Sequence, residues 1–162
     1  MTRTNSSCRV VLDTNVLLRA LVNHSSRSRD VVTACEERRA IALLSKPILD
    51  EYRRVLIHLQ ERDESITAFQ IQAELRKLRY FGEYIRQVST TFPFPRDPTD
   101  AKLIELAIVG GATHIVTYDA DLLSLPTARN ETGRRFRQRL RGVLVIRPDK
   151  LIREHPELLV LS

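Results

Sequence analysis

Short aliphatic runs alternate along the chain with longer segments in which apolar residues recur at helical spacing. The runs predict five strands, at residues 10–12, 41–44, 88–92, 114–117 and 143–146. The spacing predicts helices at residues 15–22, 28–39, from 47 onward, 64–86 as one helix or two, and 97–109. This alternation is typical of an α/β fold in which helices wrap a parallel sheet.

The helix at 97–109 has the clearest boundaries. Asp97 is expected to be its N-cap and Pro98 its first residue, and the pair Gly110-Gly111 is expected to end it. Upstream, Pro93 and Pro95 should end any strand that begins at Val88, because proline cannot donate to a strand ladder. The sequence therefore places an irregular link before this helix.

Two acids follow buried strands directly. Asp13 comes after Val10-Val11-Leu12, and Asp119 comes after the run 115–118. Open parallel sheets bind ligands at the carboxyl ends of their strands, so both positions suit a site. The alternative for each is an Asp that caps the following helix, which for Asp119 alone is about as plausible as a site role.

Two further acids lie on buried helix faces. Asp100 shares the inward stripe of its helix with Leu103 and Ile104, at the end nearest the strand ends, although a first-turn acid also gains stability from the helix dipole. Glu51 lies at the edge of the stripe that begins at Ile48, whereas Asp50 is expected to face solvent. Carboxylates that converge on one crevice require a compensating cation.

The donor types predict a hard metal ion. Oxygen ligands without a Cys or His cluster suit Mg²⁺ or Mn²⁺ better than zinc. The four histidines show no ligand spacing and are expected to be structural or to lie on the surface. Cys8 and Cys35 are expected to be free thiols in a reducing compartment.

Length and charge narrow the class of protein. The 162 residues, 43% of them hydrophobic, suit one soluble domain spanning residues 1–162. The residues before Val10 are polar, without a signal-like core, and no apolar run is long enough to cross a membrane, so a cytoplasmic location is expected. The formal charge of +6 favours a polyanionic partner. An acidic metal crevice in a basic chain predicts phosphodiester chemistry.

Four motifs in this order resemble the PIN-domain family of metal-dependent ribonucleases. They begin with Val11-Leu12-Asp13-Thr14-Asn15-Val16 and continue with residues 45–51, which precede Val55-Leu56. Residues 97–103 and 111–123 carry the other two motifs. Each motif is short, but their order and spacing over about residues 9–153 make the combination specific.

The resemblance implies a three-layer α/β/α sandwich around a parallel sheet. It also implies that Asp13, Glu51, Asp100 and Asp119 hold Mg²⁺ or Mn²⁺ for RNA cleavage. The match is closest to the bacterial branch of VapC-type toxins, in which a small antitoxin protein blocks the site and the toxins often form homodimers. Three more residues match supporting positions of that branch, namely Asn15, Asp97 and Asp121. Asp97 as a helix cap and Asp121 as a first-turn acid remain open alternatives.

Residues 127–142 form a longer and more basic link than the family pattern has. The stretch contains one acid, Glu131, and six arginines that are candidates for RNA binding: Arg129, Arg134, Arg135, Arg137, Arg139 and Arg141. It leaves the crevice side just after Asp119, so it is placed to contact RNA or an acidic antitoxin segment. The alternative is a solvated mobile loop or short helix.

The function that these features favour is endoribonuclease. A non-catalytic RNA- or partner-binding module on the same fold is the alternative, against which the presence of all four acids argues. A phosphoacceptor receiver-type domain would need adjacent acids after the first strand, and only Asp13 stands there.

Overall fold

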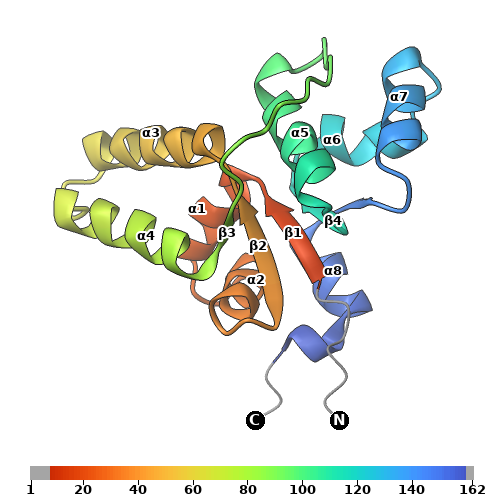
Figure 1. Cartoon of the computed structure of the whole chain (residues 1–162). Helices are drawn as coiled ribbons and strands as arrows, with labels where there is room; N and C mark the ends of the chain where they lie inside the picture. The colour runs from red at the N-terminus through yellow and green to blue at the C-terminus, as the bar shows by residue number, and fades with distance from the viewer. Residues whose placement is uncertain (1–7, 160–162) are drawn as a thin grey trace.

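A parallel sheet of five strands forms the centre of the computed structural model, which describes residues 8–159 (Figure 1). The strand order is β3-β2-β1-β4-β5, so β1 and β4 are neighbours in the interior of the sheet. The bounds are β1 Cys8–Leu12, β2 Ala40–Leu44, β3 Glu83–Tyr84, β4 His114–Val116 and β5 Leu144–Ile146. Residues 1–7, which include most of the polar segment expected to lack a signal, and residues 160–162 lie outside the described range.

Helices connect the strands and cover the sheet. They are α1 Thr14–Val22, α2 Arg27–Glu36, α3 Lys46–Arg62, α4 Ala68–Phe81, α5 Ala101–Gly110, α6 Ala120–Ser124, α7 Glu131–Arg139 and α8 Pro148–Glu154. The described residues also contain three single 3₁₀ turns: η1 Pro98–Asp100, η2 Leu125–Thr127 and η3 Pro156–Leu158. The α/β class predicted from the alternation is confirmed.

The alternation of side chains along each strand separates two hydrophobic cores. Val10 and Leu12 point into one core, where they meet residues of α1, α2, α4 and α8. Val11 and Ile115 point into the other, which contains residues of α5 and α7. The sheet therefore lies between two helical layers, as the α/β/α expectation required (Figure 1).

The strand predicted at 88–92 is wrong. The third strand is the two-residue β3, directly after α4, and residues 88–92 have no regular structure. Phe92 is buried, but as an anchor in the second core, and its N–H donates to the carboxylate of Glu105 at 3.0 Å rather than to a neighbouring strand. An apolar run thus marks burial here, not strand pairing.

The predicted helix at 64–86 is shorter than expected. It begins at Ala68, behind a capping box formed by Thr67 and Gln70, and ends at Phe81. A Cβ on the next residue, Gly82, would lie 2.4 Å from Leu44 Cδ1, so glycine allows the chain to pass close to β2. Arg9 of β1 reaches across β2 and binds both carboxylate oxygens of Glu83, at 2.8 and 3.1 Å.

The helix end at Gly111 and the free thiols predicted from the sequence are confirmed. Gly111 adopts a left-handed conformation with φ of 63° and ends α5. Cys8 and Cys35 are free thiols. The arginine-rich stretch includes α7, which is fixed to the second core by Phe136 and Leu140, so it is an ordered short helix. None of the helices between residues 8 and 159 combines the length and the apolar character needed to cross a bilayer.

Candidate functional site

Asp13 and Asp119 lie at the same edge of the sheet because β1 and β4 are parallel neighbours. The N–H of Asp13 continues the ladder by donating to Val116 O at 3.0 Å. The fully buried hydroxyl of Thr117 then donates to Asp13 Oδ2 at 2.7 Å and accepts from the N–H of Asp119 at 3.0 Å. One threonine, to which sequence analysis assigned no role, therefore fixes both strand-end acids.

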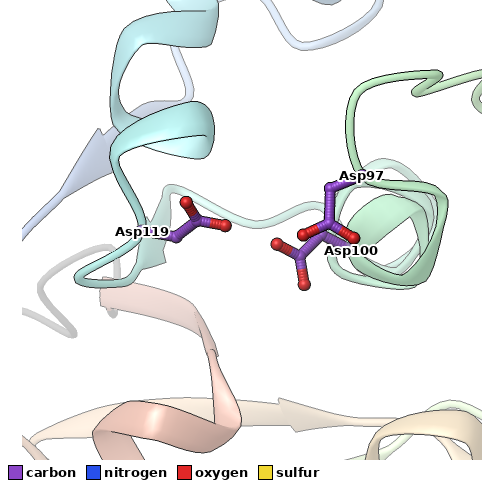
Figure 2. A group of neighbouring side chains, drawn as sticks. All are labelled: Asp97, Asp100 and Asp119. Atoms are coloured by element: carbon purple, nitrogen blue, oxygen red, sulfur yellow. The ribbon is translucent and has the colours of Figure 1, made fainter.

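A 3₁₀ turn brings two more acids to this edge. Asp97 precedes η1 and Asp100 ends it, so both side chains face Asp119 (Figure 2). One carboxylate oxygen from each of Asp97, Asp100 and Asp119 lies within 4.8 Å of the others. Asp97 stands at the N-cap position, and its carboxylate accepts from the Thr99 hydroxyl at 2.6 Å.

The predicted helix at 97–109 is corrected accordingly. The first turn from Pro98 is 3₁₀, and α5 itself begins at Ala101. Residues three apart are eclipsed in a 3₁₀ turn, so Asp97 and Asp100 lie on a common side.

Burial and mutual repulsion disfavour the charged forms of Asp100 and Asp13, whereas hydrogen bonds, chiefly from the Thr99 hydroxyl, lower the pKa of Asp97. Asp100 is 9% exposed; burial, a hydrogen bond to Asp119 and the charges of Asp13, Asp97 and Asp119 raise its pKa to about 8. Burial also raises the pKa of Asp13, and the charges of Glu51 and Asp119 add to this against the opposing effect of the Thr117 hydrogen bond. A divalent cation would favour the ionised forms that the neighbouring charges oppose.

Glu51 is held on a separate side of the site. Its Oε1 pairs with Lys102 Nζ at 2.9 Å, and its Oε2 accepts from the hydroxyl of Thr14 at 3.1 Å. Lys102 lies within the motif at residues 97–103, whose pattern alone indicates no function for it. An ammonium group therefore lies among the acids on the Glu51 side.

The remaining predicted residues occupy the edge of this region. Asp119 caps α6, since its Oδ1 accepts from the N–H of Asp121 at 2.9 Å. The same carboxylate therefore caps a helix and belongs to the three-acid group. Asp121 is a first-turn acid of α6, as one alternative expected, and pairs with Arg96 at 3.1 Å. Asn15 lies exposed in the first turn of α1, and its supporting role stays a prediction.

The six candidate arginines divide into two sets. Arg135 pairs with Glu131, Arg137 donates to the carbonyls of Pro126 and Ala128, and Arg139 donates to Thr90 and Thr91, so these three support the structure. The other three are exposed, and their side chains make no such contact within residues 8–159: Arg129, Arg134 and Arg141.

The donor set fits Mg²⁺ or Mn²⁺. The group consists of carboxylates alone, and among residues 8–159 it is the one group of three or more acid, His or Cys side chains close enough to share an ion. Hard divalent cations prefer such oxygen ligands. Asp97, Asp100 and Asp119 are the residues that would hold the ion, with Asp13 beside them.

Comparison with known proteins is consistent with this geometry. A PIN domain model matches residues 9–121, which is well over half of the chain. No curated protein matches the chain. PIN domains are generally nucleases, and PIN nucleases typically use divalent metals. The match extends from β1 through Asp121 and so includes every predicted acid of the site. The chain therefore belongs to the PIN domain family.

Proposed function

We propose that the protein is a Mg²⁺- or Mn²⁺-dependent endoribonuclease. The observation that carries this proposal is the convergence of Asp97, Asp100 and Asp119, with oxygens within 4.8 Å of one another, at the strand ends of a PIN domain. When bound there, the cation supplies an activated water and charge stabilisation for phosphodiester hydrolysis. All four predicted acids, Asp13, Glu51, Asp100 and Asp119, line this region.

The residues of the chain have separate tasks in this proposal. The three-acid group attracts the cation, and Thr117 keeps Asp13 and the backbone of Asp119 in fixed positions. Arg96, 72% exposed beside Asp97, supplies a positive charge at the rim. Fixed groups of this kind orient a reacting phosphodiester without further rearrangement.

RNA is the proposed substrate, held by phosphate contacts outside the acidic centre. Arg129, Arg134 and Arg141 are the exposed guanidinium groups available around α7. Such contacts carry no base specificity and weaken as salt concentration rises. We therefore expect neutralising these three arginines to reduce the salt dependence of RNA binding, whereas neutralising the structurally engaged Arg135 should change it less.

The cleavage test uses purified protein and a panel of RNAs. We expect cleavage with Mg²⁺ or Mn²⁺, none with EDTA, and loss of at least about 100-fold in Asp100→Asn, consistent with the size of electrostatic effects in active sites. Asp149→Asn, which removes a half-buried acid of α8, is the matched control and should cut as the parent does. RNA binding without cleavage under all these conditions would favour the non-catalytic binding module.

We further propose that the protein is the toxin of a toxin–antitoxin pair and acts in the cytoplasm. In this proposal it forms a homodimer, and a small antitoxin protein inhibits it. The support is the motif resemblance together with the family match. Expression should arrest growth, co-expression of a small protein from the adjacent reading frame should restore it, and Asp100→Asn should not arrest growth. Normal growth on expression of the active parent would refute the toxin role while leaving the nuclease proposal intact.

A further inference from the structure

Lys102 is a sheltered cation within an otherwise acidic site. It is the second residue of α5, and its side chain is 16% exposed. Its ammonium group contacts Glu51 Oε1 at 2.9 Å and also donates to the carbonyl oxygen of Thr99. Because the other oxygen of Glu51 accepts from Thr14, both oxygens of this carboxylate already have partners within the protein.

The acids of the site fall on two sides, with Asp13 between them. Asp97, Asp100 and Asp119 form the compact group, whereas Glu51 is paired with Lys102. Asp13 links the two sides, since the next residue, Thr14, donates to Glu51, and Thr117 joins the Asp13 carboxylate to the backbone of Asp119. The order across the site is therefore Glu51, then Asp13, then the three-acid group.

We propose that this site holds a single divalent cation on the three-acid side, and that the Lys102 ammonium takes the place of a second cation on the Glu51 side. This inference rests on the proposed metal-dependent nuclease function and specifies its metal content. A two-metal site of the usual kind has its ions about 4 Å apart, shared by carboxylates. Here the carboxylate that would complete the second position, Glu51, is engaged by Lys102 and Thr14.

Electrostatics oppose a second ion while Lys102 is present. A divalent cation between Asp13 and Glu51 would lie next to a fixed positive charge, and the pair is sheltered, with Glu51 only 21% exposed. Solvent and salt screen such a repulsion much less than they would at an open surface. An ammonium group is also a compact point charge suited to a phosphate oxygen, so Lys102 supplies charge on this side without an exchangeable ion.

The test counts Mn²⁺ ions and does not depend on turnover. Mn²⁺ binding is measured by isothermal titration calorimetry, and spin coupling between neighbouring ions by electron paramagnetic resonance, on the parent chain and three variants. Lys102→Met removes the charge but keeps an unbranched side chain, and Lys102→Arg keeps the charge. Lys150→Met is the control for net charge, since Lys150 lies on α8, paired with Glu154.

We expect one Mn²⁺ per chain for the parent, Lys102→Arg and Lys150→Met, and two spin-coupled ions for Lys102→Met. Two ions in the parent, or one ion in folded Lys102→Met, would overturn the inference while leaving the nuclease proposal standing. If Lys102→Met does not fold, as judged by circular dichroism, Lys102→Gln takes its place with the same expectation. An absence of Mn²⁺ binding by the parent would refute both the inference and the proposed metal-dependent function.

Discussion

Replacing Thr117 with valine tests whether one buried hydroxyl holds the site together. Valine matches threonine in shape, so the substitution removes two hydrogen bonds without opening a cavity. The carboxylate of Asp13, itself 5% exposed, loses its donor at 2.7 Å, and the N–H of Asp119 loses its acceptor at 3.0 Å.

The expected loss of stability follows from these two contacts. A hydrogen bond to a charged group contributes about 1.5–3 kcal/mol, and a buried donor left unpaired costs about 1–3 kcal/mol. Because both contacts share one hydroxyl, we expect the free energy of unfolding to fall by about 2–4 kcal/mol in total. That is a substantial part of the roughly 5–15 kcal/mol that holds a typical domain folded.

The loss should also depend on pH. The Thr117 hydrogen bond lowers the pKa of Asp13 against the raising effect of burial. A bond that lowers the pKa stabilises the fold when the carboxylate is ionised, and its contribution disappears as pH falls through the pKa. The difference between Thr117→Val and the parent should therefore be larger at pH 8 than at pH 4.

The assay is urea unfolding followed by circular dichroism, with EDTA present so that metal binding does not contribute. Thr127→Val is the matched control, because its hydroxyl makes one weak contact, at 3.3 Å to Ser124 O, on an exposed residue, and should change stability by less than about 0.5 kcal/mol. If Thr117→Val unfolds within 0.5 kcal/mol of the parent at pH 8, Thr117 does not have the structural role assigned to it.

Four other perturbations follow from the structure. Burial lowers the pKa of His114, so as pH falls this imidazole is protonated in the unfolded chain before it is protonated in the folded one, and the free energy of unfolding should fall below about pH 6.5. In urea titrations, His114→Asn should lose less stability than the parent between neutral and acid pH, and an unchanged pH profile would contradict this account. Phe136→Ala should cost about 3–5 kcal/mol, because the ring is 1% exposed and packs edge-on against Phe92 at 6.4 Å, and a calorimetric unfolding temperature equal to the parent's would refute this anchoring of α7. Gly133→Ala should destabilise by about 1–3 kcal/mol, measured in the same way, since its Cβ would lie 2.2 Å from the carbonyl oxygen of Ala128. Mn²⁺ at 100 times the dissociation constant of the parent should stabilise the parent by about 2.7 kcal/mol in thermal unfolding. An equal gain in Asp100→Asn at the same Mn²⁺ concentration would exclude that residue as a ligand.

Local sequence patterns predicted the parts of the site that depend on one element. Asp13 follows a strand whose three residues before it are all buried, and parallel strands bring Asp119 to the same edge once β1 and β4 pair. The end of α5 at Gly111 is likewise local, because a left-handed residue is needed there. Such features could be located from neighbouring residues alone.

Features formed between distant segments could not be predicted in this way. Lys102 meets Glu51 only because α3 and α5 come together, although the two residues are 51 positions apart in the chain. The run at 88–92 looked like a strand, since periodicity does not distinguish a paired strand from a loop with a buried Phe92. The approach of Asp97 and Asp100 to Asp119 joins segments about 20 residues apart, which the spacing within one segment did not specify.

The outer strands of the sheet have a consequence for how the protein behaves at high concentration. An exposed edge strand offers a row of unpaired N–H and C=O groups, along which another chain can add and start aggregation. Here the two edges are β3, with two residues, and β5, with three, and Pro148 soon follows β5 without an N–H to offer. The charged bridge from Arg9 to Glu83 lies at the β3 edge. A second copy therefore finds too short a template for edge-to-edge pairing, and the fold resists intermolecular β-sheet growth.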